Sequence, residues 1–200
     1  MYRLNIMAKA TIEEFCGAYY FLSNFYVAPF TDVKGRVWPT VVHYYQAHKT
    51  PIKEEFKAIR LAETPGIAKQ LGSKCSLRDD WNSARITVMR KALRYKFWQN
   101  TPLRVQLMST HPRDLVEGNT WGDRFWGVCK GTGENMLGFL LCELRNGYVR
   151  MFNEGFDMMY PYYEARRELE ARDVRKAETN NVPRLFDFDP QQLKALNRRH

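Results

Sequence analysis

The stretch DWNSARITVMRKALRYKFW, residues 80–98, decides the fold class because it carries the clearest helical pattern in the chain. Its apolar side chains recur every three or four residues and share one helical face: Ile86, Met89, Leu93 and Phe97. We expect the arginines between them to remain in solvent: Arg85, Arg90 and Arg94. A helix of this length needs neighbouring elements against which to bury its apolar face.

The segments around this helix supply those neighbours. Patterning predicts further helices near 40–50, 53–62, 65–71, 101–109 and 134–146, with Thr40 as the N-cap of the first. Residues 18–38 are rich in Tyr, Phe and Val, and Lys34-Gly35 is a turn signal, so we expect a strand, a reversal and a returning strand that ends at Trp38. The predicted fold is α+β and predominantly helical, with a small N-terminal β element.

Composition limits the class of protein. A chain of 200 residues with 44% apolar residues can bury a substantial core, and one domain is the default at this length. No apolar run is long enough for a membrane span, and the N-terminal residues lack the apolar stretch of a secretory signal. We therefore expect a cytoplasmic protein without a membrane partner.

The net charge of +9 is concentrated in the first part of the chain. Residues 150–200 hold 10 basic and 9 acidic residues, whereas residues 1–149 hold 21 basic and 13 acidic residues. This excess favours an anionic ligand, either a phosphorylated small molecule or nucleic acid, although solubility alone also accounts for such a charge.

Cysteine and histidine spacing gives no metal pattern. The four cysteines are widely separated and form no CxxC pair, which favours reduced thiols. His43 and His48 are five residues apart, not the four of a helical zinc pair. We expect no catalytic metal and no cofactor.

A glycine-rich block with two indoles, Trp121-Gly-Asp-Arg-Phe-Trp-Gly127 followed by Gly131-Thr-Gly-Glu-Asn-Met-Leu-Gly138, is the strongest indication of a functional site. Glycines let the backbone approach a ligand, indoles offer flat faces to a base, and a carboxylate can orient water. Asp123 is the first catalytic candidate, and Trp126 is a candidate wall of a base pocket. The structural alternative for Asp123 is a residue that braces the turn.

Several separate motifs point to one family. Gly17-Ala-Tyr-Tyr-Phe-Leu-Ser-Asn-Phe-Tyr26, Trp38-Pro-Thr40, His43-Tyr-Tyr-Gln-Ala47, Lys96-Phe97 and the glycine-rich block occur in one order. In this the chain resembles the YbiA-like, or NADAR, family. The resemblance covers residues 12–149, which we expect to form the YbiA-like domain. Residues 150–200 are expected to form a C-terminal extension that is partly helical, with a charged helix near 164–178.

The resemblance implies an N-glycosidase-like hydrolase that acts on a phosphorylated ribosyl or ADP-ribosyl substrate. Substrates known in the family include ribosylated pyrimidine intermediates of riboflavin synthesis and ADP-ribosyl groups attached to guanine in nucleic acid. The alternative from another class is a non-catalytic module that binds ADP-ribose or a nucleotide. A third reading, a nucleic-acid-binding domain with a basic surface, lacks any RRM, KH or zinc-finger pattern.

One position departs from the family pattern. Relatives read Pro-Thr-x-Glu-His-Tyr, and the resemblance implies a catalytic role for that glutamate, but this chain has Val42. Valine can neither accept a proton nor orient water. Either the chain is an inactivated variant, natural or engineered, or Asp123 carries more of the catalysis than the family scheme implies.

The remaining candidates would bind the substrate. Trp81, in the first turn of the long helix, is either a packing anchor or a surface for a base or ribose, and the resemblance favours the second role. The candidates for phosphate are Lys96, Lys49 and Arg85. The candidates for neutral hydrogen bonds are Ser23, Asn24, Asn119 and Asn135. We expect Asp123, Trp126 and Trp81 to line a common site.

Overall fold

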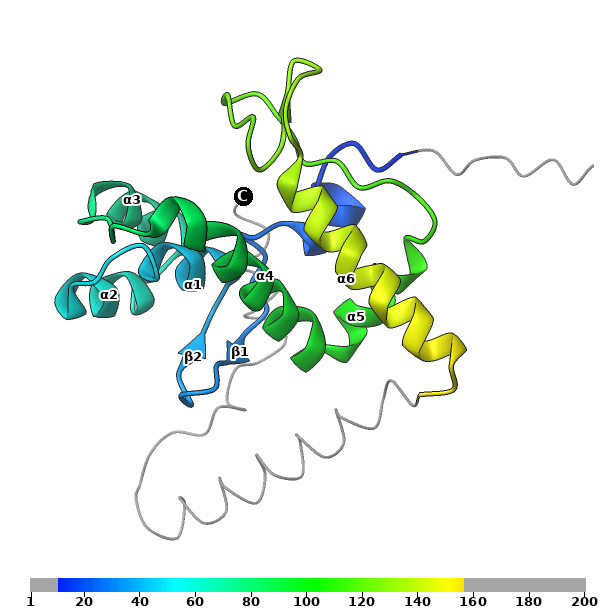
Figure 1. Cartoon of the computed structure of the whole chain (residues 1–200), viewed down its shortest axis with the longest axis horizontal. Helices are drawn as coiled ribbons and strands as arrows, with labels where there is room; N and C mark the ends of the chain where they lie inside the picture. Colours follow the sequence, from blue (N-terminus) through cyan, green and yellow to red (C-terminus); the bar gives the residue numbers. More distant parts are fainter. Residues whose placement is uncertain (1–10, 157–200) are drawn as a thin grey trace, which may run out of the picture. The chain divides into compact units, whose positions relative to one another are not determined.

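The computed structural model describes residues 11–156, which divide into two units (Figure 1). One unit contains Asn24–Thr101, and the other combines the segment up to Ser23 with Pro102–Phe156. The predicted charged helix near 164–178 lies outside the described residues. The fold is α+β and mostly helical, as predicted, with only two-residue strands.

The Asn24–Thr101 unit is a hairpin followed by helices. Its elements are β1 (Phe30–Thr31), β2 (Val37–Trp38), α1 (Val41–Ala47), α2 (Lys53–Arg60), α3 (Pro65–Lys74) and α4 (Trp81–Gln99). The antiparallel strands pair Phe30 with Trp38. Trp38 is fully buried and packs edge-on against Tyr44 of α1, with ring centroids 5.0 Å apart. The predicted reversal and returning strand are confirmed.

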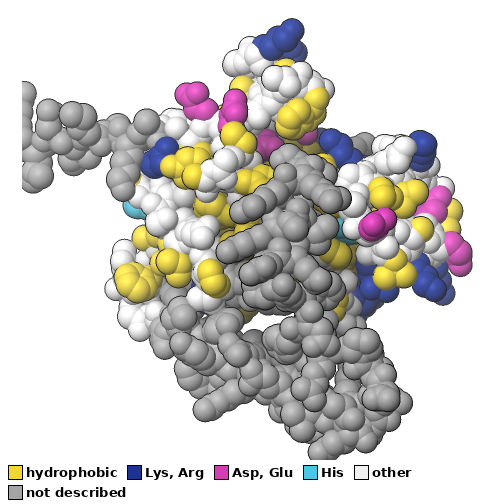
Figure 2. Space-filling model, turned by 180° about the vertical axis from the view of Figure 1, so that it is seen from behind, with side chains coloured by type: hydrophobic (Ala, Val, Ile, Leu, Met, Phe, Trp, Pro, Cys, Tyr) yellow, Lys and Arg dark blue, Asp and Glu magenta, His cyan; other side chains and the backbone are white. Residues whose placement is uncertain are grey.

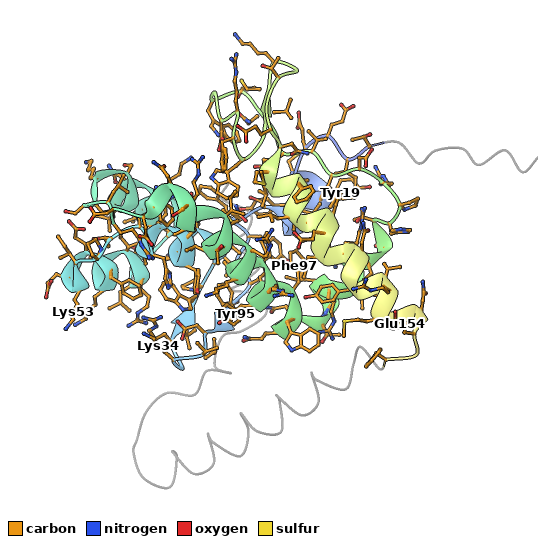
Figure 3. The ribbon with its side chains drawn as sticks, viewed as in Figure 1. Tyr19, Lys34, Lys53, Tyr95, Phe97 and Glu154 are labelled. Atoms are coloured by element: carbon orange, nitrogen blue, oxygen red, sulfur yellow. The ribbon has the colours of Figure 1, made fainter. Side chains whose placement is uncertain are left out.

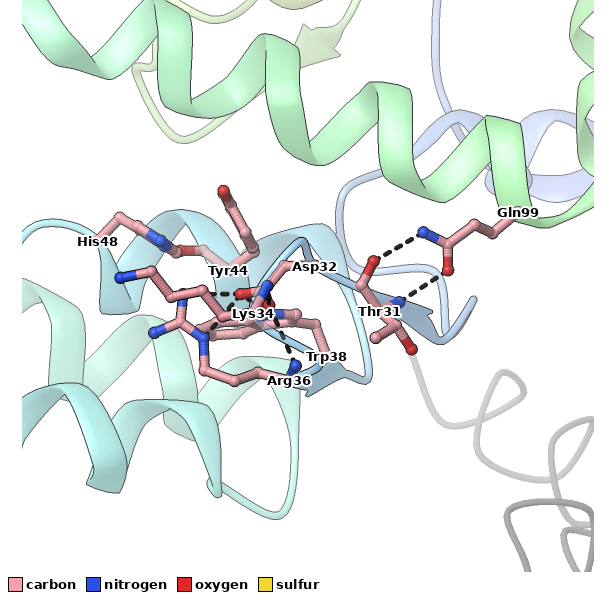
Figure 4. Close-up of polar contacts among 8 residues, drawn as sticks. All are labelled: Thr31, Asp32, Lys34, Arg36, Trp38, Tyr44, His48 and Gln99. Atoms are coloured by element: carbon pink, nitrogen blue, oxygen red, sulfur yellow. Dashed lines mark hydrogen bonds and ion pairs between the residues drawn. The ribbon is translucent and has the colours of Figure 1, made fainter. Parts of the chain in front are cut away.

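Asp32 holds the hairpin together (Figure 4). Its carboxylate accepts hydrogen bonds from the backbone N–H groups of Lys34 and Arg36, and from the Trp38 indole at 3.0 Å. The Arg36 guanidinium donates to it at 2.7 Å. Burial opposes ionisation of Asp32, but these donors outweigh it and hold its pKa below the ordinary value. In Figure 3, Lys34 lies at the hairpin and Lys53 at the start of α2.

Thr40 fixes the start of α1, as predicted. Its hydroxyl accepts the His43 backbone N–H at 3.3 Å and lies 2.8 Å from the His43 ring Nδ1. The His43 Nε2 lies 3.1 Å from the Ala62 carbonyl and therefore donates to it. These bonds tie the first turn of α1 to the end of α2. All seven residues of α1 are buried, so the helix forms the centre of this unit.

The second unit contains η1 (Gly17–Leu22), α5 (Thr101–Ser109), β3 (Gly118–Asn119), β4 (Val128–Cys129) and α6 (Met136–Asn153). The prediction of a strand from residue 18 was wrong, because Gly17–Leu22 is a 3₁₀ helix that buries Phe21 and Leu22. A short aromatic run does not distinguish these conformations. The helix predicted over 134–146 continues to Asn153 and buries Tyr148.

No helix within residues 11–156 is long and apolar enough to cross a membrane. In the same range, no group of three or more His, Cys, Asp or Glu side chains has a metal-binding arrangement.

Candidate active site

Asp123 braces the glycine-rich loop through one of its two carboxylate oxygens. Its Oδ1 accepts the backbone N–H groups of Phe125 at 3.1 Å and Trp126 at 2.9 Å. The bracing role considered from the sequence is therefore present. Within the described residues, no hydrogen bond engages Oδ2, and the side chain is only half-buried. This oxygen keeps the lone pairs that orienting a water molecule would require.

Two asparagines hold the same loop and are themselves satisfied. The Asn119 side chain accepts the Asp123 N–H at 3.0 Å and donates to the Asp123 and Val128 carbonyls. The Asn135 side chain accepts the Glu117 N–H and donates to the Leu115 carbonyl. Asn135 also adopts a positive φ of 50° at the N-cap of α6. The Asn119 side chain therefore braces the loop, and the Asn135 side chain ties the end of the loop to residues 115–117. Their roles in substrate binding remain predictions.

The loop also closes onto the first turn of α6. The backbone N–H groups of Met136 and Leu137 donate to the carbonyls of Phe125 and Trp126, both at 3.0 Å. The Asn135 N–H donates to the Gly127 carbonyl at 3.4 Å. Loop and helix are therefore joined directly through the backbone.

In the Asn24–Thr101 unit, Val42, Tyr45 and Gln46 share one face of α1, and Lys49 follows two residues after the helix; we call this surface the α1 face. α1 packs against both α3 and α4 (Figure 1). Trp81 is 8% exposed, and its ring lies 5.0 Å from that of Tyr45. The Lys49 ammonium lies 5.6 Å from the Tyr45 ring centre and donates to the Gly72 carbonyl at 3.4 Å. This arrangement places an indole, a phenol and a cation together, and such groups can bind an aromatic, anionic ligand.

Lys49 is a half-buried cation without a carboxylate partner among residues 11–156. Burial lowers the pKa of its ammonium, and the positive charge of Lys69 acts in the same direction. A bound anionic ligand would stabilise the charged form of Lys49 and so oppose both effects on its pKa.

Val42 lies on the same face and is 5% exposed. Its backbone N–H donates to the Asn24 carbonyl at 3.2 Å, which fixes Asn24 beside α1. The Asn24 Oδ1 is buried and has no hydrogen-bond partner in the described part of the chain. Val42 itself adds only apolar surface. The α1 face therefore offers polar groups, but position 42 supplies no carboxylate.

The other basic candidates lie on α4. Arg85, one turn after Trp81, and Arg90 are both half-buried, whereas we expected them to lie in solvent. Arg94 is exposed, as predicted. Lys96 is fully buried, with its ammonium 5.5 Å from the Tyr26 ring and 5.0 Å from the Phe97 ring. Its predicted role in phosphate binding remains a prediction. At 1.5 Å per residue it lies about 22 Å along α4 from Trp81.

Ser23 is 7% exposed and follows η1. Trp81 belongs to one unit, and Asp123 and Trp126 belong to the other. That these three side chains line one site remains a prediction.

Gln46 was missing from the predicted site although it shares the α1 face with Val42 and Lys49 at helical spacing. Lys69 was missing because its proximity to Lys49 arises from packing between helices.

Comparison with known proteins now connects these features to a family. The NADAR domain model matches residues 13–148. N-glycosidase YbiA of Escherichia coli (strain K12) is 44% identical over 126 residues, covering 62% of this chain and 78% of that protein. Riboflavin biosynthesis protein VVA0006 of Vibrio vulnificus is 41% identical over 129 residues, covering 62% of this chain and 34% of that protein. The NMR structure of E. coli YbiA superposes with a TM-score of 0.66 at 37% identity, covering 74% of this chain and 89% of that one. The chain belongs to the NADAR family and has a YbiA-like fold.

Proposed function

We propose that this protein is an N-glycosidase that hydrolyses the N-glycosidic bond of a phosphorylated ribosyl or ADP-ribosyl compound. Its relatives include proteins named as N-glycosidases. The observation that carries the proposal is the α1 face, where the Trp81 and Tyr45 rings adjoin Lys49, a cation without a carboxylate partner among the described residues. Rings suit the leaving base, and the ammonium suits the phosphate.

Hydrolysis also needs an oriented water and stabilisation of an oxocarbenium-like sugar. Asp123 is our candidate for both tasks because its Oδ2 is not used by the loop. A carboxylate there would accept a proton from water and place negative charge near the developing sugar cation. The substrate is a free metabolite or an ADP-ribosyl group on nucleic acid, and the assay below covers both.

Asp123→Asn tests the proposal because asparagine keeps the Oδ1 acceptor for Phe125 and Trp126 but removes the charge. We expect release of the base to slow by about 100-fold or more, with nearly unchanged melting temperature. Chromatography would follow base release from a ribosylated pyrimidine phosphate and from ADP-ribosylated guanine. Asp114→Asn, at another aspartate of this unit, is the control. Equal rates for Asp123→Asn and the unsubstituted chain would leave Asp123 with the bracing role alone.

The second candidate is a binding module without turnover, and buried, apolar Val42 favours it. This reading predicts that the chain binds ADP-ribose but releases no base from either substrate. Calorimetry with ADP-ribose, run beside the chromatographic assay, separates the two candidates.

A further inference from the structure

Gln46 carries an unsatisfied acceptor on the α1 face. The side chain is only 9% exposed, and its Oε1 is buried without a hydrogen-bond partner among residues 11–156. It lies over Gly72 of α3, where a Cβ would come within 2.6 Å of the Gln46 Cβ and nearer still to Oε1. A buried amide oxygen without a donor is unfavourable, because it has lost its hydrogen bonds to water. A ligand hydroxyl would supply the missing donor.

Two lysines flank Gln46. The Lys49 ammonium lies 3.4 Å from the Gly72 carbonyl, and Lys69 precedes Gly72 by one turn on the same face of α3. The Lys69 ammonium lies 5.5 Å from the Phe25 ring centre. Each ammonium lies near an aromatic ring, Tyr45 for Lys49 and Phe25 for Lys69, and the positive charge of Lys69 lowers the pKa of Lys49. A phosphate dianion would attract both ammonium groups.

We propose that Gln46 and Lys69, together with Lys49, form a ribose-phosphate subsite between α1 and α3. The two ammonium groups bind the phosphate, and the Gln46 Oε1 accepts a hydrogen bond from a ribose hydroxyl. The juxtaposition of paired cations with an unsatisfied acceptor selects a sugar phosphate over a free phosphate or an unphosphorylated nucleoside. This inference rests on the proposed function for the choice of ribose as the sugar.

Calorimetry with ribose 5-phosphate and with inorganic phosphate tests the subsite on the full chain. Lys69→Ala should weaken both ligands about tenfold, the loss expected for one charge-assisted hydrogen bond. Gln46→Met keeps the side-chain volume and should weaken ribose 5-phosphate about fivefold while leaving inorganic phosphate unchanged. Exposed Lys57 and Gln70 provide the matched controls Lys57→Ala and Gln70→Met, which should bind as the unsubstituted chain does.

Three results would overturn the subsite: no binding of ribose 5-phosphate, unchanged affinity in Lys69→Ala, or equal losses for both ligands in Gln46→Met. If Gln46→Met unfolds, Gln46→Asn is used instead, because it keeps an amide but moves the oxygen back by one methylene group. It should likewise weaken ribose 5-phosphate and leave inorganic phosphate unchanged. The chromatographic assay separates this inference from the proposed function. Base release without these binding differences would remove the subsite alone, whereas the binding differences without base release would remove the activity alone.

Discussion

At the scale of single residues, position 42 separates catalysis from binding. Val42→Glu should raise base release by about 100-fold or more, the contribution typical of a positioned general acid or base. The new carboxylate would lie on the face of α1 that carries Gln46. Turnover and melting temperature would be measured together, since an unpaired buried carboxylate costs several kcal/mol.

Val42→Gln is the control for this substitution because it adds a polar group of the same size without charge. It should not raise turnover. A folded Val42→Glu protein no faster than Val42→Gln would remove position 42 from the mechanism.

His43 makes stability depend on pH. Burial lowers its pKa below 6.5, although the hydrogen bond with the Ala62 carbonyl opposes the shift. The unfolded chain therefore takes up this proton at a higher pH than the folded chain does. The contribution of His43 to stability is fully present above about pH 6.5. It is lost as the pH falls toward the pKa of His43 in the folded chain. Melting temperatures across this range should decline less steeply in His43→Gln.

Exposed His111 provides the comparison, since His111→Gln should preserve the full decline. An equally steep decline in His43→Gln would assign the effect to other groups, of which His48 is the first candidate because burial also lowers its pKa.

At the scale of elements, the contact between α1 and α3 depends on Gly72. Gly72→Ala would place a methyl group against Gln46, and such overpacking costs about 1–3 kcal/mol. Gly66→Ala on the same helix is the control, because its Cβ would meet only Thr64 Oγ1, at 3.7 Å. Urea unfolding should show a loss for Gly72→Ala and none for Gly66→Ala. Adding Gln46→Ala should restore part of the loss, and no restoration would place the strain elsewhere.

The elements that could be predicted from the sequence are those marked by a long periodic pattern or by a cap residue close to the element. The α4 helix with its buried Met89, Leu93 and Phe97, and the Thr40 cap, were predicted because each depends on neighbours within a turn or two. The exposure of Arg85 and Arg90 was not, since they are half-buried. The 3₁₀ helix at Gly17–Leu22 was missed because burial, not propensity, decides so short a run. Lys69 and burial of Lys96 were also missed, since packing between helices creates their surroundings.

At the scale of the whole molecule, charge is divided unequally. Residues 24–101 hold 14 basic and 6 acidic residues, whereas 11–23 and 102–156 together hold 6 basic and 8 acidic residues. Dark blue Lys and Arg side chains are visible around α2 and α3 in Figure 2. Within residues 11–156, the basic excess belongs to 24–101, which carry the α1 face.

This division predicts that affinity for ADP-ribose falls as salt is raised, since salt screens charges over about 10 Å at 0.1 M. Calorimetry at low and high ionic strength would measure the decline. Single-stranded DNA is the comparison: a salt dependence several times steeper for DNA than for ADP-ribose would favour the nucleic-acid-binding reading. Salt-independent ADP-ribose binding would contradict an electrostatic role for this unit.

The junction between the glycine-rich loop and α6 has a chemical consequence. A glycine-rich loop that runs into a helix often cradles phosphate with free backbone amides. Here the amides of Asn135, Met136 and Leu137 are already consumed by loop carbonyls. These three amides are therefore not available to a phosphate, and an anion bound at this junction would depend on side chains. Single side-chain substitutions could then alter ligand preference here without changing the hydrogen bonds of the loop backbone.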